Sequence, residues 1–120
     1  MSLIRSVSQE EGARLLYGAE DREIRKVPAG DLLWYAIGDR AVAAMAQRSR
    51  VAEFKRCFVV PLWRGRGYGV ALLLHRLAEA RRSGCKYARV TTPLPRWFLA
   101  NGWTETRRSR HYVMLERVCL

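Results

Sequence analysis

The sequence predicts a single α/β domain over residues 1–120, with a mixed sheet flanked by helices. The chain has 120 residues, enough for one domain and too few for two. Apolar residues make up 49% of it, so a buried core can form. Helix-like and strand-like segments follow one another in the order α, β, β, β, α, β, α, β, which is typical of α/β folds.

The first half of the chain predicts one helix and one hairpin. Ser8 and Glu11 have the spacing of a capping box, so a helix is expected from there to about residue 17. Residues 32–37 predict a buried strand, and the turn signal after it predicts a return strand over residues 40–48. A helix competes for residues 41–47 because alanine favours it, but the tight turn favours a strand.

The second half predicts three further strands and two helices. A strand over residues 53–60 is rich in Phe and Val and ends at a proline, and residues 67–83 form the clearest helix, followed by Gly84 at its C′ position. Another strand is expected over residues 86–91. A short helix follows over residues 96–100, and residues 104–117 predict a closing hairpin or one bent strand.

The helix over residues 67–83 shows a helical apolar pattern. We expect one stripe to face the core and the charged positions beside it to face water. The stripe consists of Val70, Leu73, Leu74, Leu77 and Ala80, and the charged positions off it are Arg76, Glu79 and Arg82.

Positive charge is concentrated in the second half. The net charge is +11 overall, +1 over residues 1–50 and +10 over residues 51–120. A field of this kind attracts an anionic partner, so a phosphorylated cofactor and nucleic acid both stay open. A solvated arginine-rich surface with no partner is the simpler alternative.

The composition excludes several classes of protein. No run of about 18 apolar residues occurs, so no membrane-spanning segment is expected. The first residues lack a secretion signal, which predicts a cytoplasmic protein. Three cysteines, Cys57, Cys85 and Cys119, fit no zinc spacing, so reduced thiols and no metal are expected. Cys57 alternates with an apolar neighbour and is expected to be buried.

A loop with three alternate glycines lies between the strand over residues 53–60 and the clearest helix. Glycine allows positive φ and close approach to the backbone. The free amides at a helix start, together with the helix dipole, bind phosphate. We expect Arg64 and Arg66 to add charge-assisted bonds. Neither a Walker loop nor the dinucleotide fingerprint matches this spacing. The loop is Arg64-Gly65-Arg66-Gly67-Tyr68-Gly69.

The residues around this loop resemble the central motif of the GCN5-related N-acetyltransferase (GNAT) superfamily. The motif has an aromatic–Val–x–Pro strand end followed by Arg/Gln-x-x-Gly-x-Gly/Ala, and here the segment is Cys57-Phe58-Val59-Val60-Pro61-Leu62-Trp63-Arg64-Gly65-Arg66-Gly67-Tyr68-Gly69-Val70. The resemblance implies a mixed, mostly antiparallel sheet and transfer of an acetyl group from acetyl-CoA to an amine. It also implies that Phe58, Val59 and Val60 line the pantetheine arm and that residues 64–70 bind the pyrophosphate.

The resemblance also supplies candidates for proton transfer. Glu53 lies eleven residues before Arg64, where the histone-acetylating branch of the family has its general base. A surface glutamate paired with Lys55 or Arg56 is the alternative. Phe98 occupies the position of the family's usual tyrosine acid, so Tyr112, Tyr68 or Tyr87, water, or unassisted loss of the thiolate must serve.

Three functions stay open at this point. The first is an N-acetyltransferase with an amine acceptor that the sequence does not identify. The second is a nucleic-acid-directed member of the same fold, of the viral DNA-modifying kind. The third is a coenzyme A-binding or basic interaction module without catalysis. A homodimer through the last strands is open as well.

Overall fold

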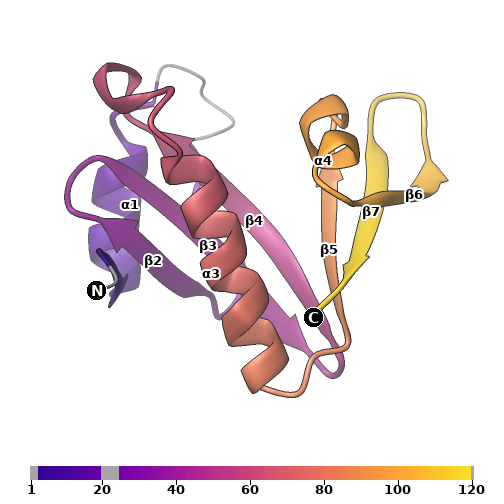
Figure 1. Ribbon diagram of the computed structural model, residues 1–120. Coiled ribbons are helices and arrows are strands. Elements are labelled where there is room, and N and C mark those ends of the chain that lie inside the picture. The colour runs from indigo at the N-terminus through magenta and orange to yellow at the C-terminus, as the bar shows by residue number, and fades with distance from the viewer. Residues whose placement is uncertain (1–2, 20–24, 120) are drawn as a thin grey trace. The chain divides into compact units, whose positions relative to one another are not determined.

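A computed structural model describes residues 3–19 and 25–119 of the chain (Figure 1). Seven strands form one sheet in the order β1-β2-β3-β4-β5-β7-β6. β4 and β5 are parallel, and the other pairs whose register is described are antiparallel. The mixed, mostly antiparallel sheet is therefore confirmed. No helix within the described residues is long and apolar enough to span a membrane.

The predicted elements are present, with ends that shift by a few residues at most. β1 was not predicted, because four residues with two polar ones among them carry almost no strand signal. The sequence also predicts a polar, charged connection over residues 20–26, and most of it lies outside the described residues. The closing segment is a hairpin. The elements are β1 (Ile4–Val7), α1 (Gln9–Leu16), β2 (Leu33–Ile37), β3 (Ala41–Arg48), β4 (Val51–Val59), the 3-10 turn η1 (Pro61–Trp63), α3 (Tyr68–Arg82), β5 (Tyr87–Thr92), α4 (Arg96–Ala100), β6 (Thr104–Arg108) and β7 (Val113–Val118).

The chain divides into two compact units. The first contains the described residues up to 46 together with residues 55–76, and the second contains residues 47–54 and those from 77 onward. β4 contributes to both units, as do β3 and α3. One domain over residues 1–120 stays a prediction.

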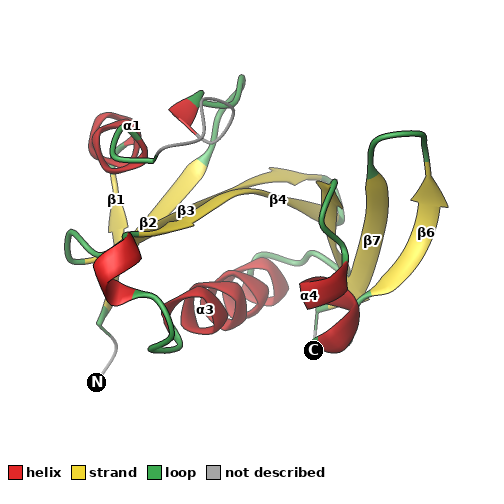
Figure 2. Cartoon of the chain, turned by 90° about the horizontal axis from the view of Figure 1, so that it is seen from above, coloured by secondary structure: helices red, strands yellow, loops and turns green. Residues whose placement is uncertain are grey.

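In the first unit, β2 is buried on both faces because helices cover both. Figure 2 shows α1 and α3 on opposite faces of the sheet. Trp34 clusters with Leu15 and Leu16 of α1, while the ring of Tyr35 contacts His75 of α3 at 4.9 Å between centroids. A strand buried on both faces has a continuous apolar run instead of an alternating one. The prediction of a buried strand is confirmed.

The alanine-rich segment for which strand and helix were both considered is a strand, β3. The strand pairs with β2 from Ile37↔Ala41 to Leu33↔Met45, and all six residues of Ala41–Ala46 are buried. The tight turn and this pairing override the helix preference of alanine, which is only a weak local bias.

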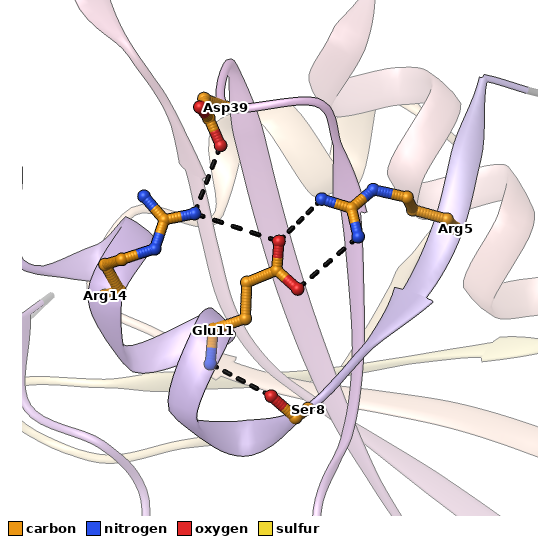
Figure 3. A network of polar contacts seen from close by, with 5 residues as sticks. All are labelled: Arg5, Ser8, Glu11, Arg14 and Asp39. Atoms are coloured by element: carbon orange, nitrogen blue, oxygen red, sulfur yellow. Dashed lines mark hydrogen bonds and ion pairs between the residues drawn. The ribbon is translucent and has the colours of Figure 1, made fainter.

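The start of α1 forms half of the predicted capping box (Figure 3). The Ser8 hydroxyl accepts a hydrogen bond from the Glu11 N–H at 3.2 Å. Among the described contacts, the Glu11 carboxylate does not complete the box by accepting a hydrogen bond from the Ser8 N–H. It accepts from Arg5 of β1 at 2.6 Å, and this bond lowers the pKa of Glu11. Arg14 links Glu11, at 3.8 Å, to Asp39 in the β2–β3 turn, at 3.2 Å.

The predicted exposure of Arg76 is wrong. Arg76 is only 2% exposed, and its guanidinium donates to Ala44 O of β3 at 3.1 Å and to Leu72 O at 3.3 Å. Burial lowers the pKa of this guanidinium. A buried charge needs such partners, and a guanidinium can reach main-chain carbonyls that a sequence pattern does not show.

The buried face of α3 is also turned relative to the predicted stripe. Leu73, Leu77 and Ala80 are buried as expected, but Leu72 is buried too. Leu74 is 52% exposed and Val70 is 38% exposed. The face therefore follows residues 72, 73, 76, 77 and 80, with Arg76 among them.

An aromatic cluster and a closing hairpin organise the second unit. Trp103 is buried and its ring lies 5.6 Å from that of Phe54 and 5.3 Å from that of Phe98. β7 pairs with β5 and with β6, whose five residues are all exposed. The β6–β7 ladder changes register between Glu105 and Arg107, which marks an irregularity in β6.

The close approach of α1 to β2 predicts an effect on stability. A Cβ added at Gly12 would lie 2.4 Å from Cε3 of the buried Trp34 ring. Gly12→Ala should lower the free energy of unfolding by about 1–3 kcal/mol, because overpacking forces shifts in the core. Gly18→Ala is the matched control, since its Cβ would meet only Leu15 O at 3.7 Å. Urea unfolding measures both, and equal stabilities would contradict the close approach.

Candidate functional site

β4 continues well beyond the residues that pair with its parallel partner β5. The β4–β5 register runs from Val51↔Tyr87 to Glu53↔Arg89, and β4 continues from there to Val59. The next groups along the chain are partly engaged: the Val60 N–H donates to Arg40 O at 2.8 Å, and Val60 O accepts from the Trp63 N–H at 2.8 Å. The end of β4 is thus a main-chain segment held from one side by the start of β3.

Two glycines turn the chain from η1 into α3. Gly65 has φ +79° and Gly67 has φ +82°, both in the left-handed region that side chains disfavour. Gly69 does not have positive φ, and a Cβ placed on it would meet nothing within 4 Å. The backbone conformation therefore requires glycine at the first two positions. At Gly69 neither the backbone nor a neighbouring atom excludes a side chain.

The start of α3 presents unpaired amides. The first helical bond runs from the Ala71 N–H to Gly67 O at 2.9 Å. The three N–H groups before it, on Tyr68, Gly69 and Val70, have no acceptor within the helix and point out of its positive end. The preceding loop residues 64–67 are exposed. An exposed helix start of this kind binds anions such as phosphate.

The side chain of Arg64 turns back onto β4. Its Nε donates to Val59 O at 3.0 Å, and its guanidinium carbon lies 5.9 Å from the centroid of the Phe58 ring. Arg64 thus supports the strand end that leads into the loop. Arg66, the other loop arginine expected to contact phosphate, stacks over Trp63 instead. Its guanidinium carbon lies 4.9 Å from the centroid of the Trp63 ring.

Arg40 is a cation near this loop that the sequence did not single out. Its guanidinium carbon lies 4.0 Å from the centroid of the Trp63 ring, and Nη1 donates to the Tyr68 hydroxyl at 2.9 Å. Arg40 precedes Arg64 by 24 positions. Its place depends on β3 lying beside β4, so no local motif could have revealed it.

In the second unit, Glu53 belongs to a row of charges across the sheet. Arg89 of β5 lies 3.9 Å from the Glu53 carboxylate and 2.7 Å from that of Glu116 on β7. The three residues are cross-strand neighbours, and their side chains are about a quarter to a third exposed. Arg56, one of the partners considered for Glu53, donates to Lys26 O.

Tyr112 and Phe98 are two further positions considered for proton transfer. Tyr112 is 52% exposed in the β6–β7 turn, and its N–H donates to the Ser109 hydroxyl. Among the contacts of the described residues, none joins Tyr112 to Glu53. Phe98, in the position of the family's usual tyrosine, packs against Trp97 and Trp103.

Glu116 also lines a shallow pocket of about 370 Å³ in the second unit. The threonines of β6 and the last residues of β7 form most of its wall. The lining residues are Tyr87, Gly102, Thr104, Thr106, Glu116, Arg117 and Val118.

The prediction that Cys57 is buried is wrong. Its thiol is exposed, whereas Cys85 and Cys119 are buried. The protein atoms around Cys57 still displace enough water to raise the pKa of the thiol, and the positive charge of Arg76 opposes that rise. Alternation along a strand assigns a residue to a face, but only packing decides whether that face is covered.

The parallel strand pair, the glycine turn and the open helix start together define a class of α/β protein that holds a phosphorylated cofactor at the end of a strand. The model of the acetyltransferase (GNAT) family matches residues 7–96, so the chain belongs to that family. It is therefore an acyltransferase. No curated protein matches the sequence.

Solved structures agree with this fold. A Klebsiella pneumoniae protein assigned as an acyl-CoA N-acyltransferase has a TM-score of 0.78 and 20% identity, over 98% of this chain and 97% of that one. The PaiA N-acetyltransferase of Thermoplasma acidophilum in complex with coenzyme A has a TM-score of 0.74 and 18% identity, over 96% of this chain and 97% of that one. A GNAT family acetyltransferase from Elizabethkingia anophelis with acetyl-CoA bound has 0.74 and 13%, over 96% of each chain.

The loop glycines predict opposite effects on stability. Gly67→Ala places a side chain in the left-handed region and should lower the free energy of unfolding by about 1 kcal/mol. Gly69→Ala, in the first turn of α3 with open space around it, should leave stability unchanged or raise it by up to about 1 kcal/mol. Thermal unfolding of both variants distinguishes them. Equal losses at the two positions would contradict the described backbone.

The exposed thiol predicts a pH dependence. Cys57 should be alkylated by iodoacetamide before the two buried cysteines, and mass spectrometry of digests identifies the site. Because the thiolate is the nucleophile and the pKa is raised, the rate should reach half its maximum above the pH of a free thiol, about 8.5. Cys57→Ser is the control that removes the fast phase. Earlier labelling of Cys85 would contradict the assignment.

Proposed function

We propose that the protein transfers an acetyl group from acetyl-CoA to an amine and that its pyrophosphate site is the start of α3. The observation that carries this is the set of amides on Tyr68, Gly69 and Val70, which precede the first helical bond of α3 and follow two left-handed glycines. Family membership supports the reaction, and two relatives of the same fold hold coenzyme A or acetyl-CoA.

The cofactor would lie along the end of β4. The pyrophosphate binds at residues 64–70, and the pantetheine arm runs beside Phe58, Val59 and Val60. Since the Val60 N–H donates to Arg40 O and Val59 O accepts from Arg64, the arm meets a strand end whose groups are already partly satisfied. The second lone pair of each carbonyl oxygen remains an acceptor for it.

The reaction forms a C–N bond and breaks the C–S bond of the thioester. The amine must lose a proton, and the coenzyme leaves as a thiolate. Glu53 is the proposed base, acting through a water molecule. Its carboxylate is partly buried and lies beside Arg89, which Glu116 holds from the other side at 2.7 Å. The positive charge of Arg89 therefore lies 3.9 Å from the proposed base.

The proton donor for the thiolate has three tyrosine candidates. Tyr112 and Tyr87 are exposed, and the Tyr68 hydroxyl accepts a hydrogen bond from Arg40 while keeping its own proton to donate. Water as the donor and unassisted departure of the thiolate are the alternatives, the latter because thiols ionise near pH 8.5.

Substitution of Glu53 tests the proposed chemistry. Purified protein with acetyl-CoA and a panel of amines should release free thiol, and Glu53→Gln should slow this about 100-fold near neutral pH, where a general base matters most. Glu105→Gln on the exposed strand β6 makes the same change in charge and should keep the rate. Tyr112→Phe, assayed alongside, decides whether that hydroxyl takes part. An unchanged rate in Glu53→Gln would remove Glu53 as the base.

The other functions considered for the sequence stay predictions. Coenzyme binding without acetylation of any amine in the panel would identify a non-catalytic module. The arginines of the closing hairpin are exposed, but Arg108 pairs with Glu105 at 2.6 Å. Nucleic-acid binding, a homodimer and a cytoplasmic location have no support among the described contacts.

A further inference from the structure

Two arginines share one indole ring beside the glycine loop. The guanidinium carbons of Arg40 and Arg66 lie 4.0 Å and 4.9 Å from the centroid of Trp63, within the range of cation–π attraction. We call Arg40, Trp63, Arg66 and Tyr68 the Trp63 cluster. Arg40 and Arg66 are exposed, and the two rings are partly exposed, so the cluster is open to a ligand.

The backbone of Arg40 is fixed from both sides. Its N–H donates to Ile37 O at 2.9 Å and closes the β2–β3 turn, while its carbonyl accepts the Val60 N–H at 2.8 Å. The second bond ties the start of β3 to the residue that follows β4. The position of Arg40 relative to the loop is therefore set by main-chain bonds rather than by a flexible side chain alone.

The side chain of Arg40 is held toward the start of α3. Nη1 donates to the hydroxyl of Tyr68, the first residue of that helix, at 2.9 Å. A guanidinium has five N–H groups in a planar fork, so most of its donors remain for a second acceptor. A planar cation stacked on an aromatic ring is also pre-organised for phosphate oxygens.

The ion pairs around the cluster leave its positive charge without a carboxylate. Neither Arg40 nor Arg66 belongs to an ion pair recorded among the described residues, and the recorded pairs of other arginines lie elsewhere. Asp39, next to Arg40 in sequence, pairs with Arg14. Two like charges beside one ring repel each other, and a bound anion that both guanidiniums contact offsets this repulsion.

We propose that Arg40 is a phosphate-binding residue of the cofactor site and acts together with Arg66 and the α3 amides. This rests on the proposed use of coenzyme A. The ligand group is a phosphoryl oxygen, from either the pyrophosphate or the 3′-phosphate of the coenzyme. Arg64, whose Nε donates to Val59 O, supports the strand end, and Arg40 takes the role that the sequence suggests for Arg64.

Binding measurements on matched variants test the proposal. Isothermal titration at about 0.15 M salt compares coenzyme A, 3′-dephospho-coenzyme A and pantetheine, with wild type, Arg40→Gln and Arg48→Gln. Arg48 is the control, because it lies exposed at the other end of β3 and its loss changes the net charge equally. Arg40→Lys keeps the charge without the planar fork, and unfolding midpoints check that each variant folds.

Arg40→Gln should weaken coenzyme A binding about tenfold, as expected for loss of a charge-assisted hydrogen bond, and Arg48→Gln less than about twofold because salt screens distant charges. Arg40→Lys should lose less than Arg40→Gln. Pantetheine, which has no phosphate, should bind both glutamine variants equally. A loss that disappears with dephospho-coenzyme A identifies the 3′-phosphate as the contact, and one that persists identifies the pyrophosphate.

Two results would overturn the inference alone: equal weakening by Arg40→Gln and Arg48→Gln, or an Arg40→Gln loss that remains with pantetheine. Each would mean that Arg40 contacts no phosphate while the cofactor site itself stands. Wild-type protein that binds none of the three ligands would overturn the proposed cofactor and this inference together. If Arg40→Gln fails to fold, Arg40→Lys takes its place, and its affinity for coenzyme A must then fall below that of Arg48→Gln; an affinity equal to or above that of Arg48→Gln would overturn the inference.

Discussion

The turn from β4 into α3 is the constraint on which the site depends. Two residues with positive φ, Gly65 and Gly67, let the chain reverse direction so that the helix starts with its amides facing outward. The Val60–Arg40 main-chain bond holds the strand end before that turn. Because amides at a helix start have no partner of their own, the fold itself prepares a place for an anion before any side chain contributes.

The sequence predicted correctly those features that depend on a few consecutive residues. The Ser8 cap, the Gly38-Asp39 turn and the glycine loop were found from spacing alone, because each depends on a few consecutive residues. The burial of Arg76, the exposure of Cys57 and the place of Arg40 were not found. Each depends on which element packs against the residue, and that information lies far away in the sequence. The short strand β1 was missed because it is defined mainly by its pairing with β2.

Cofactor binding and proton transfer have different kinds of structural support here. The proposed phosphate site consists mainly of backbone, so it follows from the fold and from two glycines. The groups proposed for proton transfer are side chains, and they depend on their individual surroundings. Phe98 belongs to an aromatic cluster with Trp97 and Trp103, where a ring without a hydroxyl packs with no polar group to satisfy. Glu53 is held in a row of alternating charges with Arg89 and Glu116.

The irregularity in β6 has a consequence for how the chain avoids aggregation. β6 is the last strand of the sheet, and every one of its residues is exposed. An outer strand with regular geometry offers a row of free N–H and C=O groups on which another chain can add a strand. The change of register between Glu105 and Arg107 interrupts that row. The charged side chains of Glu105, Arg107 and Arg108 would also lose water if an apolar strand covered them, which disfavours such a contact. The outer edge thus resists edge-to-edge growth of the sheet while it remains in water.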